Sequence, residues 1–218
     1  MVITMVEIQD IFKEHSTKYR QNHRLPLNQL KALSSIKACR TAELGGHIDA
    51  CDECGHIRIS YNSCRNRHCP KCQGLAKERW LENRKDDLLS VGYFHAVFTL
   101  PADLNALALR NQQIVYNLLF KSVSETLLEL AEEPKYLGAQ TGITALLHTW
   151  GQNLMFHPYI HCIVPSGGLS LDGVRWINSR KKFFIPVRVL SKKFKGKFIA
   201  KLQHAYFNKE LKFMGEIK

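Results

Sequence analysis

Apolar and polar positions follow one rhythm in the first part of the chain and another in the second, with the change near residue 90. In the first part the apolar residues recur every three or four positions, which predicts helices over residues 4–22, 27–38 and 75–91. Between residues 40 and 73 this periodicity is lost, and glycine, asparagine and cysteine become frequent. A segment with so few apolar residues cannot build its own core, which is typical of a small domain held by a metal ion.

The second part of the chain has the pattern of a sheet combined with helices. The aromatic and β-branched run Tyr93–Leu100 ends at Pro101 and predicts a buried strand. The later apolar positions predict a long helix and two more strands, over residues 104–132, 142–150 and 159–165. These elements indicate a sheet domain that follows a helical, metal-stapled one.

The predicted fold class is therefore α+β, with two domains. Residues 1–90 form a small helical and zinc-ribbon-like domain that binds zinc and DNA, and residues 91–218 form the sheet domain. The N-terminus lacks the cationic start and apolar stretch of a signal peptide, and no apolar run is long enough to cross a bilayer. We expect a soluble cytoplasmic protein without a membrane partner.

The charge balance is strongly basic, with 31 Lys and Arg against 19 Asp and Glu and a formal net charge of +12. Lysine and arginine set against phosphates release counterions, so such a chain favours a polyanionic partner such as DNA. A solvated basic surface explains the charge equally well, because net charge bears on association and not on fold.

Two cysteine pairs predict a zinc site. Cys51-x-x-Cys54 and Cys69-x-x-Cys72 are separated by 14 residues, and each pair places two thiolates on one tight turn. Two such turns complete a tetrahedral site of four sulfurs. A site with four protein ligands has no open position for water, so we expect this Zn²⁺ to be structural.

Four more metal-ligating residues lie nearby, namely Cys39, His47, Cys64 and His68. As ligands, they can replace one of the two pairs or build a second metal site. The commoner alternative is a purely structural role, in which the cysteines are small buried residues and the histidines are hydrogen-bonded. Cationic side chains at two places are candidate DNA contacts or plain solvated charge. They are Arg65, Arg67 and Lys71 beside the cysteines, and Lys181, Lys182, Lys192 and Lys193 in the basic tail.

Five motifs resemble one family in their content and in their order along the chain. They are CRTAELGGH (39–47), YNSCRNRHCPKCQ (61–73), YFHAVFTLP (93–101), HTWGQNL (148–154) and HPYIHCIVPSGGL (157–169). Together they resemble transposases of the insertion sequence ninety-one family, which are rolling-circle enzymes of the HUH endonuclease superfamily. The resemblance covers nearly the whole chain.

The resemblance implies a fold and a mechanism. The domain over residues 91–218 is expected to be a partial HUH-type nuclease, an antiparallel sheet whose middle strand carries two histidines flanking a hydrophobic residue. Those histidines and a third polar group hold Mg²⁺ or Mn²⁺, which polarises a phosphate of single-stranded DNA at an element end. A tyrosine then attacks that phosphate, which gives a 5′-phosphotyrosine and a free 3′-hydroxyl. Such a protein acts in DNA transposition and is associated with the bacterial nucleoid.

The sequence departs from the family pattern at the histidine pair. The family's two histidine positions are occupied in this sequence by Tyr159 and His161. We therefore expect His161 to be a ligand of the divalent ion, with Gln152 as a candidate third group. His157 shares the face of the strand but lies about 13 Å from His161 along a regular strand, and it can join only if Pro158 bends the chain.

A second departure concerns the nucleophile. The family's tyrosines lie on a helix downstream of the histidine strand, where this sequence offers only Tyr206. We expect a truncated or frameshifted element, and whether it retains catalysis is left open. The alternatives are a catalytically inactive, zinc-dependent DNA-binding remnant and a zinc-stapled interaction module. DNA binding that weakens steeply with salt separates the remnant from the module.

Overall fold

The computed structural model describes residues 6–180 and 185–213 and divides the chain into two compact units. Unit 1 comprises residues 1–88 and unit 2 comprises residues 89–218. Helices combine with antiparallel strands in both units, which confirms the predicted α+β class. No helix within the described ranges is long and apolar enough to cross a membrane.

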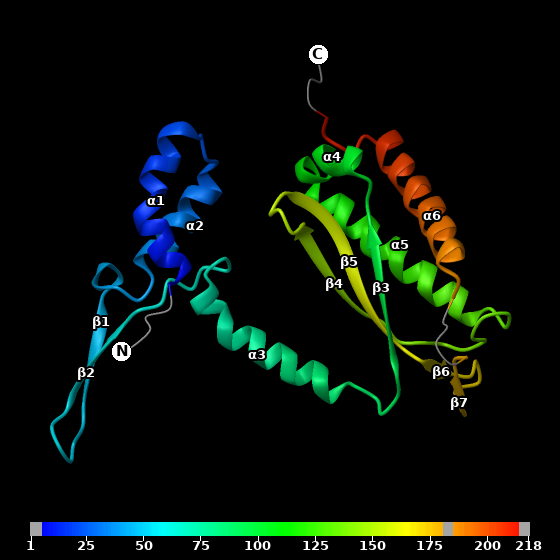
Figure 1. The fold of residues 1–218 in the computed structure, drawn as a ribbon, viewed down its shortest axis with the longest axis horizontal. Coiled ribbons are helices and arrows are strands. Elements are labelled where there is room, and N and C mark those ends of the chain that lie inside the picture. The colour runs from blue at the N-terminus through cyan, green and yellow to red at the C-terminus, as the bar shows by residue number, and fades with distance from the viewer. Residues whose placement is uncertain (1–5, 181–184, 214–218) are drawn as a thin grey trace. The chain divides into compact units, whose positions relative to one another are not determined.

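Unit 1 consists of two packed helices, a β-hairpin and a third helix (Figure 1). In chain order its elements are α1 (Ile8–Asn22), α2 (Leu27–Ala38), the 3₁₀ turn η1 (Ala42–Leu44), β1 (Gly46–Ala50), β2 (Ile57–Tyr61) and α3 (Pro70–Asp86). Its buried cluster is very small, with Ile36, Cys39 and Cys69 buried and Phe12 packed partly against them. Gln9 of α1 ties the helices together, because its side-chain amide donates to the carbonyl oxygens of Lys37 and Cys39 at 2.8 Å.

Unit 2 is built on a three-stranded antiparallel sheet in the order β3-β5-β4. In chain order its elements are β3 (Tyr93–Thr99), the 3₁₀ turn η2 (Ala102–Leu104), α4 (Asn105–Arg110), α5 (Gln112–Glu132), β4 (Thr144–Trp150), β5 (Phe156–Pro165), β6 (Gly167–Leu169), β7 (Trp176–Asn178) and α6 (Val187–Phe207). Strands β6 and β7 form a separate small hairpin.

The two faces of this sheet differ, because successive side chains on a strand point to opposite sides. On one face Phe98, Ile160, Cys162 and Val164 are buried in the core of the unit. Helices α5 and α6 lie against that face (Figure 1), and Phe194 of α6 packs edge-on against Phe98 with the ring centroids 5.1 Å apart. The opposite face carries the half-exposed and polar residues of the same strands.

An ion-pair ladder joins α5 to α6. Lys197 contacts Glu125 at 3.3 Å and Glu129 at 2.6 Å, and Lys201 contacts Glu125 at 2.9 Å. Hydrogen bonds from Lys201 and Lys197 lower the pKa of Glu125 and Glu129, respectively. The positive charges of Lys197 and Lys201 are thus paired with carboxylates of the same unit.

Candidate functional site

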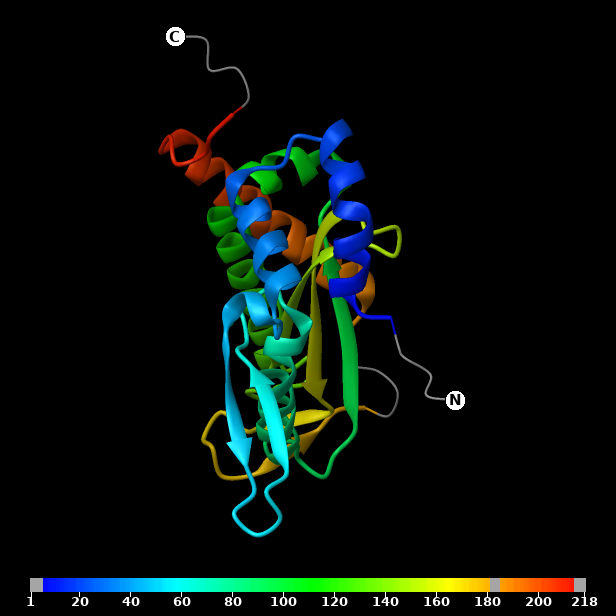
Figure 2. The same ribbon diagram turned by 90° about the vertical axis from the view of Figure 1, so that its left-hand side faces the viewer.

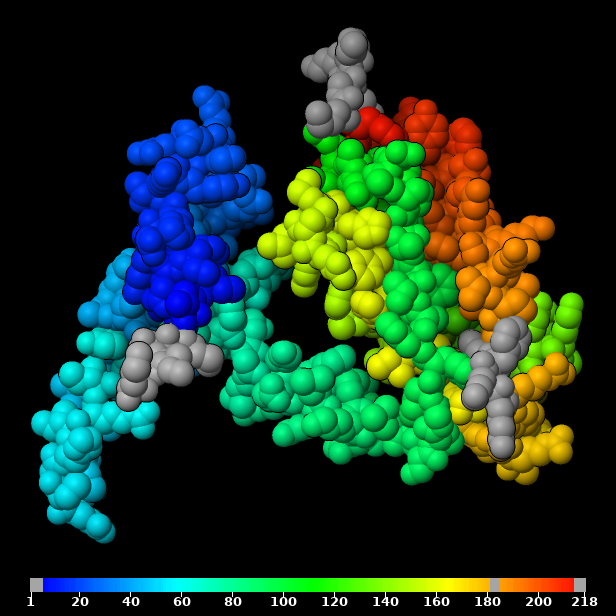
Figure 3. All heavy atoms as spheres, in the orientation of Figure 1, coloured from blue at the N-terminus to red at the C-terminus, as the bar shows by residue number. Residues whose placement is uncertain are grey.

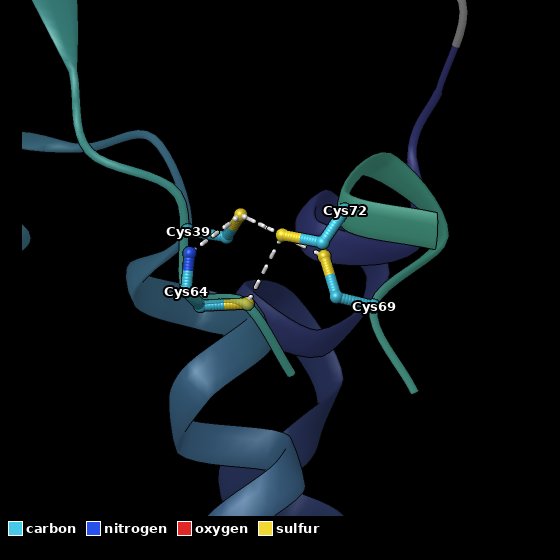
Figure 4. A group of neighbouring side chains, drawn as sticks. All are labelled: Cys39, Cys64, Cys69 and Cys72. Carbon is cyan, nitrogen blue, oxygen red and sulfur yellow. Dashed lines mark hydrogen bonds between the residues drawn. The ribbon is translucent and has the colours of Figure 1, made fainter. Parts of the chain in front are cut away.

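Four cysteine thiols meet in unit 1. Cys39 follows the last residue of α2, Cys64 lies in the loop after β2, Cys69 precedes the first residue of α3 and Cys72 lies in its first turn. Their sulfur atoms face one another (Figure 4) and all lie within 4.8 Å of one another. Pro70 is the first residue of α3, a position where the missing N–H of proline has no helical partner to lose. The helix can therefore begin directly after Cys69 and place Cys72 in the cluster.

The spacing of the four sulfur atoms fits one zinc ion. The Sγ atom of Cys72 lies 3.5 Å from that of Cys39 and 3.6 Å from that of Cys64, and Cys69 Sγ lies 3.6 Å from Cys39 Sγ. Four sulfurs bound at 2.3 Å to a tetrahedral zinc lie about 3.8 Å apart. A disulfide brings two sulfurs to about 2.05 Å, so the cluster has the geometry of a metal site and not of disulfides.

The electrostatics of the cluster favour a cation. Burial raises the pKa of the Cys64 thiol to about 12. Burial also acts to raise the pKa of Cys72, but hydrogen bonds with Cys39, Cys64 and Cys69 outweigh it and lower that pKa to about 7. Cys72 therefore ionises more readily than Cys64, and a divalent ion bound to the sulfurs favours the deprotonated form of a thiol.

Three arginines line a polar hollow of about 720 Å³ beside the hairpin of unit 1. Arg40 and Arg65 directly follow Cys39 and Cys64, and their backbones are left-handed, with φ of 55° and 52°. That conformation costs a non-glycine residue about 1–2 kcal/mol, so the surrounding structure has to stabilise it at both arginines. Arg58 of β2 is the third, and within the described residues none of these arginines has an acidic partner.

Three histidines from three neighbouring strands meet on the half-exposed face of the unit 2 sheet. His161 lies on the central strand β5, His95 on β3 and His148 on β4. Nε2 of His95 lies 2.7 Å from Nδ1 of His161, and the His148 ring lies 4.6 Å from the His161 ring between centroids. The histidines form a diagonal row, because the direct neighbours of His161 across the sheet are Val97 and Leu146.

The surroundings of His161 keep its imidazole neutral. Burial lowers its pKa, and the nearby His148 and His95 lower it further. The Tyr159 hydroxyl lies 3.2 Å from Nδ1 of His148, and Trp150 stacks on the His148 ring with the centroids 5.5 Å apart. A neutral imidazole has a free lone pair, so His161 can act as a metal ligand at neutral pH.

Two family models match the chain, one described as "Transposase zinc-binding domain" over residues 11–100 and one as "Putative transposase" over residues 142–218. Among curated relatives, "Putative transposase y4qJ" of Sinorhizobium fredii (strain NBRC 101917 / NGR234) is 49% identical over 213 residues. The chain belongs to the insertion sequence ninety-one family of transposases.

The match to y4qJ covers 97% of this transposase chain and 54% of the relative. The relative named "Transposase for insertion sequence element IS801", from Pseudomonas savastanoi pv. phaseolicola, is 33% identical over 152 residues, or 69% of this chain and 36% of that protein. The chain thus spans about half the length of the first relative and about a third of the second. No solved structure matches it.

The zinc-binding domain of this transposase family, together with the four-cysteine cluster, supports a structural zinc ion. The cluster differs from the four ligands predicted from spacing. Cys69 and Cys72 belong to it, whereas Cys51 and Cys54 lie exposed in the turn of the β1–β2 hairpin, away from the cluster. Spacing alone could not show that the hairpin carries this turn away from α3.

Cys39 and Cys64 take the two places in the cluster that were predicted for the hairpin pair. The two histidines considered with them lie outside it. Nε2 of His47 is 3.7 Å from the carboxylate of Asp49, and His68 receives a hydrogen bond from the Nε of Arg67 at 3.2 Å.

The predicted cationic DNA contacts of the transposase fall into different surroundings. Lys71 pairs with Glu7 of α1, and Lys193 pairs with Glu129 at 3.1 Å and Glu133 at 3.5 Å, so both are engaged within their own unit. Side chains that remain exposed are those of Arg65, Arg67 and Lys192. Lys181 and Lys182, also predicted as DNA contacts, lie outside the described residues.

Sequence reasoning missed His95 and His148 as neighbours of His161. Both stand in motifs that resemble the family, but only the register of the strands shows that they share one face with His161. Gln152 lies exposed in the turn between β4 and β5. His157 instead meets the Thr99 hydroxyl at 2.8 Å.

Proposed function

We propose that this chain is the DNA-binding and metal-binding part of a rolling-circle transposase that acts on single-stranded ends of an insertion element. The observation that carries the proposal is the row of His95, His161 and His148 on one accessible sheet face. In this proposal the Cys39, Cys64, Cys69 and Cys72 cluster holds the structural zinc ion that folds unit 1. The proposal includes the family's chemistry, in which a tyrosine bonds to the phosphorus to form a 5′-phosphotyrosine and the 3′-oxygen of the neighbouring nucleotide leaves as a free hydroxyl, and it assigns that nucleophile to no tyrosine of this chain.

The histidine row fits a divalent ion. Two nitrogen ligands on neighbouring corners of a metal site lie about 3 Å apart, close to the 2.7 Å between His95 and His161. Among the described residues only the cysteine cluster already has three donors within 4.8 Å, so His148 has to turn toward the other two to join them. All three donors are imidazoles, which are ligands of transition ions and not the oxygen donors that Mg²⁺ prefers.

Each residue of the row has a distinct task in the proposed site. His95 and His161 would hold the ion, and the Tyr159 hydroxyl orients His148 through the contact at 3.2 Å. The ion would supply a positive charge beside the DNA phosphate. Trp150, which is 51% exposed and stacked on His148, offers a face on which a base of the same strand can stack.

The arginine hollow of unit 1 supplies a second contact for DNA. Arg40, Arg58 and Arg65 carry full positive charge without an acidic partner among the described residues, and their forked guanidinium groups match phosphate oxygens. Contacts of this kind position a nucleic acid but do not read its sequence. The hollow therefore supports binding to the DNA backbone at the zinc-binding unit.

A catalytically inactive, zinc-dependent DNA-binding protein is the second candidate function. The observation that favours it is Tyr159, which occupies a position where the family resemblance implies a histidine ligand. Such a protein would bind DNA through its arginines and would not respond to Mn²⁺.

Binding of labelled single-stranded DNA is expected to weaken steeply as salt rises. Each phosphate contact contributes about 0.7 to the slope of log affinity against log salt, so Arg58→Ala is expected to lower the slope by about that amount. The measurement is a fluorescence anisotropy titration at several salt concentrations. Arg84→Ala is the matched control, because Arg84 pairs with Asp87 at 2.8 Å and should leave the slope unchanged. Binding that is absent, or indifferent to salt, contradicts the proposed function.

A further inference from the structure

The Cys51–Cys54 pair has no role in the four-cysteine cluster. Strands β1 and β2 pair from Gly46–Tyr61 to Ala50–Ile57, and the chain turns back between them through residues 51–56. This end of the hairpin projects from the rest of unit 1 (Figures 2 and 3). Both thiols are exposed there.

A tight turn carries the pair. Gly55 has φ of +66°, and its N–H donates to the Cys51 carbonyl oxygen at 2.8 Å. A turn of this kind brings the two thiols of a C-x-x-C pair together, and two such sulfurs are common ligands of zinc.

His56 lies directly across the hairpin from Cys51. The Cys51 N–H donates to the His56 carbonyl oxygen at 3.0 Å, so the two residues continue the ladder beyond the Ala50–Ile57 pair. Residues opposite each other in an antiparallel pair point to the same face, with Cβ atoms about 4.5–5.5 Å apart. The exposed imidazole of His56 therefore lies within reach of the Cys51 thiol.

We propose that Cys51, Cys54 and His56 hold a second zinc ion, separate from the four-cysteine site, with water in the fourth position. Two thiolates and one imidazole are a known donor set for zinc when one position stays open. The three donor atoms are not within 4.8 Å of one another in the structure, so the exposed His56 ring turns about its side-chain bonds when the ion binds. This site does not depend on the proposed function, because it is independent of DNA.

The two zinc ions are expected to differ in how firmly they are held. The four-cysteine site has four protein ligands and two buried cysteines, whereas the hairpin site has three ligands, all exposed. A chelator should therefore remove the hairpin zinc first. Unit 1 should stay folded at that stage, because the hairpin turn contributes no residue to the buried cluster of the unit.

Zinc content of the full chain tests this site. We expect the double variant Cys51→Ser/Cys54→Ser to hold one zinc ion fewer per chain than the wild type, with an unchanged circular dichroism spectrum. His56→Ala should lose its second zinc at a lower chelator concentration than the wild type does. His15→Ala is the matched control, since His15 is an exposed histidine on α1 and should change neither result.

Two other outcomes would overturn the assignment. An equal zinc content in the wild type and the double variant would show that the hairpin turn holds no ion. A difference of half an ion per chain, accompanied by dimers that disappear in the double variant, would show that a second copy supplies the missing ligands in place of His56. The absorption of the Co²⁺-loaded chain gives an independent measure, because its sulfur-to-metal band should be weaker for the hairpin site than for a site with four thiolates.

Discussion

Replacing Cys39 or Cys69 with serine is expected to release the structural zinc and unfold unit 1. Both side chains are 1% exposed, and the buried cluster of the unit contains besides them only Ile36 and partly buried neighbours. Zinc binding to small domains contributes about 10–16 kcal/mol, which exceeds what so small a core can supply. Metal analysis and limited proteolysis of unit 1 measure the two effects.

The matched control for this prediction is Cys162→Ser. Cys162 is fully buried in the core of unit 2, far from any thiol of the cluster in sequence, and its loss should leave the zinc content unchanged. Cys51→Ser is expected to leave unit 1 folded, because Cys51 is exposed at the hairpin turn. A Cys39→Ser protein with the full zinc content and wild-type resistance to protease would disprove the assigned ligand set.

Replacing His95 or His161 with alanine is expected to lower the affinity for Mn²⁺ by at least about tenfold. Changes to residues that only support a metal ligand already cost about 10–100-fold in affinity, so the loss of a ligand itself should cost no less. The two imidazoles lie 2.7 Å apart, and removing either leaves an incomplete site. Isothermal titration calorimetry of the full chain with Mn²⁺ provides the measurement.

His157→Ala is the matched control for the histidine row. His157 lies on the same strand, but its ring meets the Thr99 hydroxyl and not His161. Its replacement should leave Mn²⁺ binding within about twofold of the wild type. An equal loss in all three variants would mean that the strand, and not a ligand set, had been disturbed.

The pattern of apolar residues predicted those strands and helices that have one face toward the core of their unit. The run at Tyr93–Leu100 became β3, because its alternate residues face the core on one side. The predicted helix over residues 104–132 is interrupted at Asn111, where φ is −120° and ψ is 42°. The Asn111 side chain bonds both the N–H and the carbonyl oxygen of Lys212, and a partner so distant in sequence leaves no local signal.

The β1–β2 hairpin was absent from the prediction for a similar reason. All five residues of β1 are exposed, so the strand has no buried face and no alternation that a sequence pattern could detect. Because the hairpin was not predicted, the two C-x-x-C pairs were expected to bind one zinc ion together. The structure brings Cys39 and Cys64 to the N-terminus of α3 and leaves Cys51 and Cys54 at the hairpin turn.

The histidine row could not be predicted from the sequence either, because it depends on the register of the strands. His161 was identifiable from its motif, but His95 and His148 join it only because β3 and β4 flank β5 with Val97 and Leu146 opposite His161. A shift of one residue in either pairing would turn that strand's histidine to the core face. Register is fixed by the whole sheet and its helices, and no single motif contains it.

Binding of single-stranded DNA with and without Mn²⁺ tests the proposed function of the histidine row most directly. We expect Mn²⁺ to tighten binding to the wild-type chain by at least about tenfold, because the ion neutralises a phosphate on the sheet face. His161→Ala should bind DNA equally well without metal and gain nothing from Mn²⁺. Tightening of equal size in both proteins, or none in the wild type, would contradict a DNA-directed metal site at His161.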